Sequence, residues 1–303
     1  MDEFRFEITE ELENERIDKC LAMLINSLSR SFIQKMIREG AVKVNGLPVK
    51  GSYHVRAEDN VAFFLPKAVE PDIEPEDISL DILYEDRDVI VVNKPKGMVV
   101  HPAAGHYCGT LVNALMYHCG EELSGINGVM RPGIVHRIDM DTTGSVIACK
   151  NDAAHNCIAE QLKNHSLTRR YHAICHGIFK EEEGVIEKPI GRHPVERKKM
   201  AVNEKNGKPA LTRYRVLRRF EHYTYIECEL ETGRTHQIRV HMASIGHPLL
   251  GDALYSSQKS PFHLQGQTLH AKILGFSHPS TGRYVETDAP LPEYFQHLLE
   301  ILK

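Results

Sequence analysis

The first part of the chain shows helical and then strand-like hydrophobic patterns. Apolar spacing predicts a helix over residues 16–25 and a second helix that begins near Ser29, a residue type that often caps helices. The apolar face of the second helix would consist of Phe32, Ile33, Met36 and Ile37. Gly40 suits the position just after that helix ends. Alternation then predicts a strand over 41–46, closing in an Asn-Gly hairpin turn, and another over 60–65. The pattern indicates a small α-β unit.

From residue 81 onward the chain contains many short apolar runs separated by polar turns. Strands are predicted over 89–93, 145–149, 171–178, 211–217, 223–230 and 234–240. Helices are predicted after Thr110, after a cap at Asp152, and over 290–302 with Pro292 in the first turn. Because strands and helices do not alternate strictly, the pattern favours an α+β domain with a mixed, mainly antiparallel β-sheet over a doubly wound fold.

The segment 67–80 separates these two patterns. It follows Pro66, contains Pro71 and Pro75, and carries five acids against one lysine. Such a composition cannot bury an apolar core, so the segment is predicted to be a linker. The predicted organisation is a first domain over 1–66, an acidic linker over 67–80 and a second domain over 81–303.

Composition narrows the class of protein. The 303 residues carry a formal net charge of -4, and 42% of them are hydrophobic, which is enough for a buried core. No run of about 18 apolar residues occurs, so we expect no transmembrane helix and no membrane partner. The acidic N-terminus lacks the apolar segment of a secretory signal. The seven cysteines are odd in number and include no Cys-x-x-Cys pair, which argues for reduced thiols and a cytoplasmic location.

Charge is distributed unevenly along the chain. Residues 1–15 carry seven acids against one base, whereas 16–66 carry eight bases against four acids. The exposed side of the second predicted helix carries Arg30, Lys35 and Arg38, which are well placed to follow phosphates. Further basic clusters lie within 163–170, 192–199 and 213–219. A solvated face is the competing interpretation of any single cluster. Their separation from the acidic segments favours at least one surface that faces RNA.

Several common chemistries lack their sequence signatures. The chain contains neither a Gly-rich phosphate-binding motif nor Gly-x-Ser-x-Gly, so nucleotide hydrolysis, hydride transfer and serine hydrolysis gain no support. Among 18 histidines, His236 and His241 are five residues apart, but no carboxylate stands beside them at a ligand-like spacing. We therefore expect no metal site and no cofactor.

The stretch 133–144 concentrates charged groups between apolar strands. These groups are His136, Arg137, Asp139 and Asp141, and glycines stand at both ends of the stretch. A catalytic carboxylate must stay ionised where water is excluded, which requires a fixed cation nearby. The run 230–241 supplies candidates, and strand alternation would place Thr235, Gln237 and Arg239 on one face. A buried ion pair that only holds strands together is the alternative interpretation of Asp139.

Each of the two predicted domains resembles a known module or family. The first domain resembles the small RNA-binding module first recognised in a ribosomal small-subunit protein, and the second resembles pseudouridine synthases of the RluA family. The module pattern is Arg16-Ile17-Asp18-Lys19, Leu28-Ser29-Arg30-Ser31 and Glu39-Gly40-x-Val42-x-Val44-Asn45-Gly46. The diagnostic run of the second family is His136-Arg137-Ile138-Asp139-x-x-Thr142-Thr143-Gly144, in which Ile138 and Thr143 are conservative departures. Supporting motifs include Asn93-Lys94-Pro95, Arg170-Tyr171-x-Ala173, Thr232–His241, Gly251-Asp252 and Leu269-His270-Ala271.

The second resemblance implies an isomerase with a central cleft that detaches uracil from its ribose, rotates it and rejoins it through carbon 5. No cofactor is implied. The family's invariant aspartate corresponds to Asp139, its uracil-stacking tyrosine to Tyr171, and the cationic partner of the aspartate to Arg239. Substrate binding is assigned to Arg137, His136, Thr142, Gln237 and Arg234, and in the first domain to Arg30, Lys35 and Arg38. Gly133 and Gly144 are expected to let an RNA backbone come close.

The implied partner is structured RNA, because a reacting base must leave its helical stack and does so most easily in loops. Large-subunit ribosomal RNA is the first expectation and tRNA the second, and the protein is expected to act as a monomer. Retention of Asp139, Tyr171 and Arg239 argues against a non-catalytic RNA-binding assembly factor. A glycosidase would need two acids at a defined separation, which Asp141, two residues from Asp139, is badly placed to supply.

Overall fold

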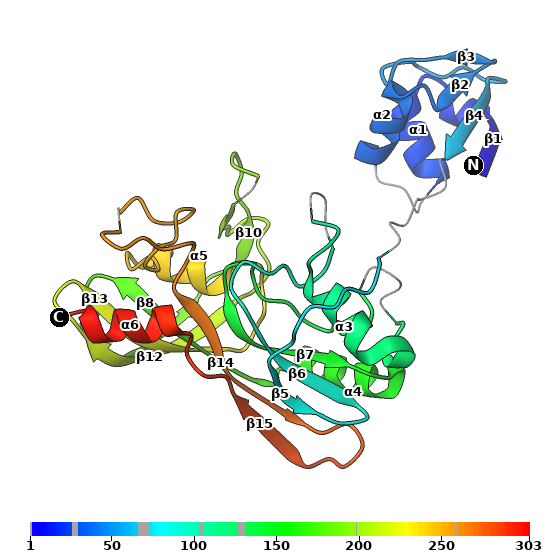
Figure 1. Ribbon diagram of the computed structural model, residues 1–303. Helices are drawn as coiled ribbons and strands as arrows, with labels where there is room; N and C mark the ends of the chain where they lie inside the picture. The colour runs from blue at the N-terminus through cyan, green and yellow to red at the C-terminus, as the bar shows by residue number, and fades with distance from the viewer. Residues whose placement is uncertain are drawn as a thin grey trace. The chain divides into compact units, whose positions relative to one another are not determined.

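Figure 1 shows the computed structural model of the chain, which describes residues 2–25, 30–65, 73–102, 106–126, 131–197, 199–258 and 260–303. The chain forms two compact units, Met1–Glu70 and Pro71–Lys303. Within the described residues, none of the helices combines the length and apolar character needed to cross a bilayer. The predicted domain boundaries at residues 66 and 81 stay predictions. The boundary between the two compact units falls between residues 70 and 71, inside the predicted linker.

The first unit packs two helices against a four-stranded antiparallel sheet with strand order β1-β4-β2-β3. Its elements are β1 (Asp2–Glu7), the short 3-10 helix η1 (Glu10–Leu12), α1 (Ile17–Leu24), α2 (Arg30–Arg38), β2 (Val42–Val44), β3 (Leu47–Pro48) and β4 (Asn60–Leu65). The hydrophobic pattern did not predict β1. In this edge strand Phe4 and Phe6 alternate with charged residues and pack on the core of the unit.

Helix α2 buries the apolar face that its spacing predicts. Ile33, Met36 and Ile37 are all less than 5% exposed. Ser29, the predicted cap, lies outside the described residues. The hairpin turn between β2 and β3 has Asn45 at φ 50° and Gly46 at φ 81°, the left-handed conformations that an Asn-Gly hairpin turn requires.

The second unit is built on a nine-stranded sheet among the described residues, with β5-β6-β7-β14-β8-β13-β12-β9 in order and β15 paired to β14. The strands are β5 (Ile82–Glu85), β6 (Val89–Lys94), β7 (Thr143–Cys149), β8 (Thr168–His176), β9 (Glu183–Glu187), β12 (Leu211–Arg219), β13 (Tyr223–Leu230), β14 (Leu269–Ser277) and β15 (Tyr284–Asp288). A separate hairpin pairs β10 (Ile190–Arg192) with β11 (Met200–Val202). Only the β7–β14 pair is parallel in this part of the chain. The α+β class with a mixed, mainly antiparallel sheet is confirmed.

Four helices of the described residues flank this sheet. They are α3 (Leu111–Cys119), α4 (Asp152–Lys163), α5 (Gln237–Ser244) and α6 (Glu293–Ile301). In Figure 1, α3 and α4 lie at the β5–β7 end, and α5 and α6 at the β8–β13 end. Thr110 caps α3 in a reciprocal capping box with Asn113. The cap of α4 is Asn151, whose side chain accepts the N–H of Ala154, and not Asp152 as predicted.

Helix α5 replaces the strand predicted over 234–240. The chain turns at His236, which has the left-handed φ of 55°, and the helix starts at Gln237. All residues from Gln237 to Met242 are buried, so the helix has no exposed polar stripe. A helix enclosed on every side gives no 3.6-residue periodicity, which is why alternation was misread as a strand.

Gly133 and Gly144 allow close packing within the protein, while their expected role toward an RNA backbone stays a prediction. A Cβ at Gly144, which has φ 105°, would lie 2.3 Å from the Ala271 carbonyl oxygen of the adjacent strand β14. A Cβ at Gly133 would lie 2.8 Å from the Cys149 carbonyl oxygen. Both glycines let the 133–144 segment lie tightly against neighbouring strands, which fixes the stretch that carries Asp139.

The last part of the predicted linker belongs to the second unit. Residues 73–80 form neither helix nor strand, yet Ile73 is 4% exposed and lies in the main core of this unit. The Asn113 side chain donates to the Glu74 carbonyl, and the Asn113 carbonyl accepts the Glu76 N–H. One apolar residue and the cap of α3 thus anchor a segment whose composition resembles a linker.

Candidate functional site

A pocket of about 270 Å³ opens beside Asp139 in the second unit. Its walls come from the 135–142 segment, from β8, and from the loop and first turn of α5. Apolar walls include Ile138, Leu230 and Leu269. All eight site residues predicted in this domain line the pocket: Asp139, Tyr171, Arg239, Arg137, His136, Thr142, Gln237 and Arg234. Segments far apart in the sequence therefore meet at one cavity.

Asp139 is held by a chain of ionic hydrogen bonds. Arg239 Nη1 donates to Asp139 Oδ2 at 2.9 Å. The other side of the guanidinium binds Asp252 in a bidentate manner, with Nε to Oδ2 at 2.7 Å and Nη2 to Oδ1 at 2.9 Å. Asp252 is fixed in turn because Oδ1 accepts the N–H groups of Leu254 and Tyr255. The prediction that Arg239 lies beside Asp139 is correct, although it assumed a strand.

The two aspartates keep Arg239 charged in spite of its burial. Burial alone would lower the pKa of Arg239, but the bonds and charge of Asp252, together with Asp139, raise it above the ordinary value. The side chain of Asp252 is 1% exposed and that of Asp139 is 18% exposed. Asp252 is therefore enclosed by its partners, whereas the side chain of Asp139 stays partly exposed and lines the pocket.

His236 lies beside the second oxygen of Asp139. Its Nε2 is 3.8 Å from Asp139 Oδ1, and its Nδ1 is 2.8 Å from the Tyr255 hydroxyl. Burial lowers the pKa of His236, although the negative charge of Asp139 acts to raise it. The Tyr255 hydroxyl also accepts the N–H of Met200 at 2.8 Å. Tyr255 thus connects β11 to the site, and its ring also lies 5.0 Å from the Arg239 guanidinium.

Tyr171 forms part of the pocket wall from β8. It is 7% exposed, and burial raises the pKa of its hydroxyl, with Asp139 acting in the same direction and Arg169 against it. The hydroxyl is therefore protonated at neutral pH. A buried aromatic ring beside a carboxylate is suited to hold a planar base against the reacting group.

The remaining predicted pocket residues differ in how free they are. Gln237 is fully engaged, since its amide bonds Thr232, the Arg234 N–H, the Leu211 carbonyl and Thr212. His136 Nε2 accepts the N–H of Ile147, and burial lowers its pKa to about 3. Thr142 accepts from Gln267. Each of these three side chains thus has at least one partner within the protein, and their predicted contact with substrate stays a prediction. Arg137 is exposed at the pocket rim, and Arg234 donates to the Pro209 carbonyl from a half-buried position.

The basic residues predicted on α2 also differ from one another. Arg30 binds the buried carboxylate of Asp18, with Nη2 3.1 Å from Oδ2, so it is partly structural. Lys35 lies 3.7 Å from Glu39, and Arg38 is exposed. The structure places these residues in the first unit, apart from the pocket residues of the second.

Four contributors to the pocket or its supports are missing from the sequence-based site: Asp252, His236, Tyr255 and Arg169. Asp252 and His236 stood inside the motifs quoted for the resemblance, but no spacing rule linked them to Asp139. Tyr255 and Arg169 gave no signal beyond residue type. The turn before α5 brings His236 to the pocket, and the pairing of β8 with β13 brings Arg169 to it.

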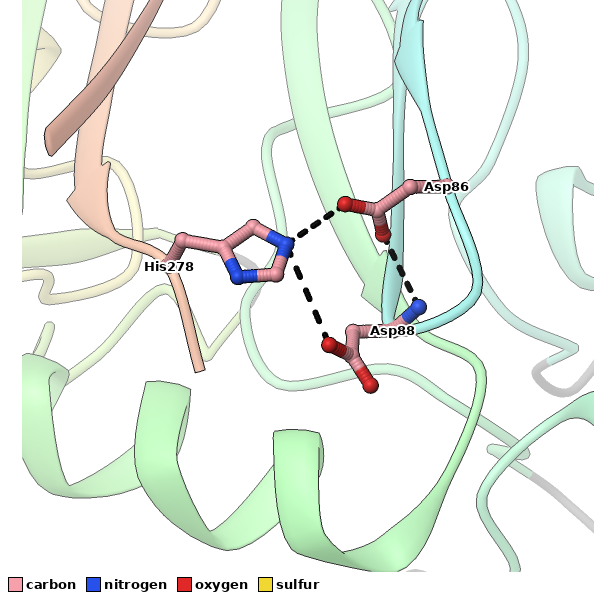
Figure 2. A group of neighbouring side chains, drawn as sticks. All are labelled: Asp86, Asp88 and His278. Atoms are coloured by element: carbon pink, nitrogen blue, oxygen red, sulfur yellow. Dashed lines mark hydrogen bonds and ion pairs between the residues drawn. The ribbon is translucent and has the colours of Figure 1, made fainter. Parts of the chain in front are cut away.

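One group of the described residues has the composition of a metal site. The ligand atoms of Asp86, Asp88 and His278 all lie within 4.8 Å of one another (Figure 2). Their atoms are already used, however. His278 Nε2 bonds Asp86 Oδ2 at 2.5 Å, Asp86 Oδ1 accepts the Asp88 N–H at 2.8 Å, and Ser280 donates to Asp88. Burial alone would raise the pKa of Asp86. Hydrogen bonds from Tyr84, backbone amides and His278 instead lower this pKa to about 2. The group closes the β5–β6 turn onto the segment after β14.

Comparisons with known proteins converge on one kind of enzyme. Residues 88–244 match a family described as RNA pseudouridylate synthase, and residues 15–61 match the S4 domain. The chain is 52% identical over 303 residues to YlyB of Bacillus subtilis, named an uncharacterized RNA pseudouridine synthase, covering 100% of this chain and 99% of that one. It is 47% identical over 305 residues to the ribosomal large subunit pseudouridine synthase D of Zymomonas mobilis, covering 97% and 96%. The solved structure of human RNA pseudouridylate synthase domain containing 1 has a TM-score of 0.57 at 28% identity, covering 70% of this chain and 83% of that one.

Proposed function

The chain belongs to the RNA pseudouridylate synthase family, and we propose that it converts specific uridines of large-subunit ribosomal RNA to pseudouridine. The choice of RNA is supported by relatives named ribosomal large subunit pseudouridine synthase D, which share 47% and 43% identity with nearly the whole chain. The S4 domain supports it as well, because a separate RNA-binding unit suits a large folded RNA.

In this proposal Asp139 is the group that acts on the ribose of the target uridine. The observation that carries the proposal is the asymmetry of its carboxylate. Among the described residues Arg239 Nη1 donates to Oδ2, His236 Nε2 lies 3.8 Å from Oδ1, and the side chain of Asp139 lines the pocket. A carboxylate that is oriented through one oxygen by a fixed cation and that lines a pocket is suited to act on a bound sugar. Tyr171 would hold the uracil ring, and its hydroxyl, protonated at neutral pH, would lie next to the base.

The reaction is an isomerisation. The bond from ribose C1′ to uracil N1 breaks, the base turns, and a bond from C1′ to C5 forms while the C5 proton leaves and N1 gains one. No electrons are gained or lost overall. The base must first leave its stack, which costs a few kcal/mol and least in loops. Arg137, exposed at the rim, would contact the nucleotides around the flipped base.

The first unit would bind parts of the RNA other than the reacting base. Arg38 and Lys35 of α2 are exposed and suited to bind phosphates. We place the reaction in the cytoplasm and expect the protein to act as a monomer. Transfer RNA is the second candidate substrate.

Sequencing of RNA after chemistry that marks pseudouridine tests the proposal. Cells that lack this protein are compared with cells complemented by the wild type or by Asp139→Asn. The proposal expects specific pseudouridines of large-subunit ribosomal RNA to vanish without the protein and to return only with the wild type. Loss of tRNA pseudouridines with unchanged ribosomal RNA would instead favour the second candidate.

A further inference from the structure

One buried cation of the pocket has no carboxylate partner. Arg169 lies on β8, two residues before Tyr171, and is 6% exposed. Its Nη2 donates to the carbonyl oxygens of Glu231 at 3.0 Å and Leu230 at 3.4 Å, while its Nε has no hydrogen-bond partner. None of the ion pairs found among the described residues includes it. Arg239, in the same pocket, has two aspartates.

The surroundings of Arg169 leave its charge uncompensated. Burial lowers the pKa of its guanidinium, and the neighbouring His136 is neutral because burial lowers its own pKa to about 3. A buried arginine without an anion is costly, because its charge has lost water and gained no counter-charge. Such a group is retained most readily where a ligand supplies the missing negative charge.

The chain also leaves room for this side chain. A Cβ at Gly233 would lie 2.8 Å from Arg169 Nη1. A side chain at this position would therefore require the end of the Arg169 side chain to shift. Gly233 and Arg169 line the same pocket.

The isomerisation itself produces a fitting anion. When the C1′–N1 bond breaks, the bonding pair leaves with N1 and makes uracil an anion. Its charge is shared by N1 and the two carbonyl oxygens until C5 binds C1′ and the C5 proton is lost. A donor that is aimed at such an oxygen in a site that excludes water stabilises the transition state strongly. Arg169, adjacent to the predicted stacking residue Tyr171, lies where the detached base would be.

We propose that Arg169 is a catalytic residue that donates a hydrogen bond to a carbonyl oxygen of the departing uracil and stabilises its negative charge. This rests on the proposed function, in which the pocket beside Asp139 receives the target uridine. A phosphate of the RNA backbone is the competing anion. The deep position among Leu230, Leu269 and Tyr171 favours a base, because phosphates remain at the hydrated rim.

The test compares two leaving groups on one enzyme. Arg169→Met and Arg169→Lys are assayed under single-turnover conditions with saturating enzyme, on RNA that carries either uridine or 5-fluorouridine at the target. Nucleosides are separated after digestion to measure pseudouridine formed from uridine and, because fluorine at C5 leaves no C5 proton to be lost, the consumption of 5-fluorouridine. The fluorinated base leaves as a more stable anion and needs less help. We expect Arg169→Met to react about 100-fold slower than wild type with uridine, a loss reduced several-fold with 5-fluorouridine, and Arg169→Lys to be intermediate.

Two further variants control this result. Arg170→Met changes the next residue, whose guanidinium pairs with Glu227 and Glu286 on the opposite face of β8, and should react like wild type. Gly233→Ala keeps the charge but displaces the guanidinium, and should reproduce the loss and its dependence on the leaving group. Because each variant is compared with itself on two substrates, partial unfolding does not alter the ratio.

Equal losses with both bases would overturn the proposal. So would a loss that lies entirely in RNA affinity and lowers the slope of log affinity against log salt by about one, which marks a phosphate contact. Asp139→Asn is run in parallel. Activity of that variant would reject the proposed site as a whole, whereas an inactive Asp139→Asn with base-independent losses at Arg169 would reject only the present inference.

Discussion

Asp18 in the first unit and Asp139 in the second are both aspartates bound by arginine, but they differ in how completely their oxygens are used. Both oxygens of Asp18 are bonded, by Arg16, Arg30 and Gln34, and its side chain is 0% exposed. Asp139 has one oxygen bound by Arg239 and the other open to a pocket, at 18% exposure. The first arrangement is closed and the second is not.

This difference separates structure from chemistry more reliably than the presence of an ion pair does. The same residue types occur in both places, so spacing and composition cannot distinguish them. A carboxylate whose acceptors are all satisfied joins α1 to α2 and has nothing left to offer a ligand. A carboxylate that is oriented through one oxygen keeps the other for a substrate.

The largest effect is expected when the cation of the open pair is removed. Arg239→Gln leaves Asp139 and Asp252 facing each other without a counter-charge, and like-charged carboxylates disfavour each other's ionised form. We expect the rate of pseudouridine formation at neutral pH to fall about 1000-fold, and the second unit to lose about 3 kcal/mol of stability. Single-turnover kinetics and urea unfolding measure the two effects. Near-normal activity would show that Asp139 needs no fixed partner.

A smaller loss is expected from the residue behind the arginine. Asp252→Asn keeps the shape but removes the charge and one acceptor that hold Arg239 in a bidentate manner. The rate should fall roughly 10- to 100-fold, as is typical when a supporting residue is removed. RNA affinity should change little, because Asp252 is buried away from the RNA. If affinity falls and the rate does not, Asp252 would be part of a binding surface instead.

The closed pair should matter for stability and not for chemistry. Burial alone would raise the pKa of Asp18. The hydrogen bonds from Arg16, Gln34 and Arg30 instead lower this pKa to about 2, below the ordinary 3.8. Because the pKa of Asp18 is lower in the fold than in the unfolded chain, ionised Asp18 stabilises the fold at a pH above the unfolded pKa. This stabilisation is lost as the pH falls from about 4 to about 2. Asp18→Asn should therefore cost about 2 kcal/mol at neutral pH. Hydrogen exchange of the α1 and α2 amides in the full chain should be accelerated at pH 7, with no change in the turnover of a short RNA substrate.

The smallest effect is expected at Tyr255. Tyr255→Phe removes the hydroxyl that joins Met200 to His236 but keeps the ring beside Arg239. One such hydrogen bond contributes about 1 kcal/mol, so the rate should fall about five-fold. Tyr255→Leu, which also removes the ring, should fall further. Equal rates for the two variants would show that the ring has no part in holding Arg239.

The sequence predicted the fold class, the two patterns of the chain and the pairing of Asp139 with Arg239, because strands, capped helices and motif residues carry local signals. It did not predict α5, since a helix that is buried on all sides has no periodicity. The assignment of Gln237 and His136 to substrate binding stays a prediction, because both line the pocket but also bond to the protein itself. An amide or imidazole in a motif looks the same whether it serves a ligand or the backbone, and the bonds to Leu211 and Ile147 are visible only in the structure.

Arg169 illustrates the same difficulty from the opposite side. In the sequence it is one of several neighbouring bases that resemble a solvated face. Its burial follows from β8 pairing with β13 and β14 on either side, which is a long-range property that local patterns do not contain.

Release of tritium from RNA labelled at carbon 5 of uracil tests the central claim most directly. The C5 proton is lost only when the base is rejoined through that carbon. Wild type, Asp139→Asn and Asp18→Asn are compared on the same labelled ribosomal RNA. We expect release by the wild type and by Asp18→Asn, and none above background by Asp139→Asn. Release by Asp139→Asn at the wild-type rate would contradict the assignment of the open carboxylate as the reacting group.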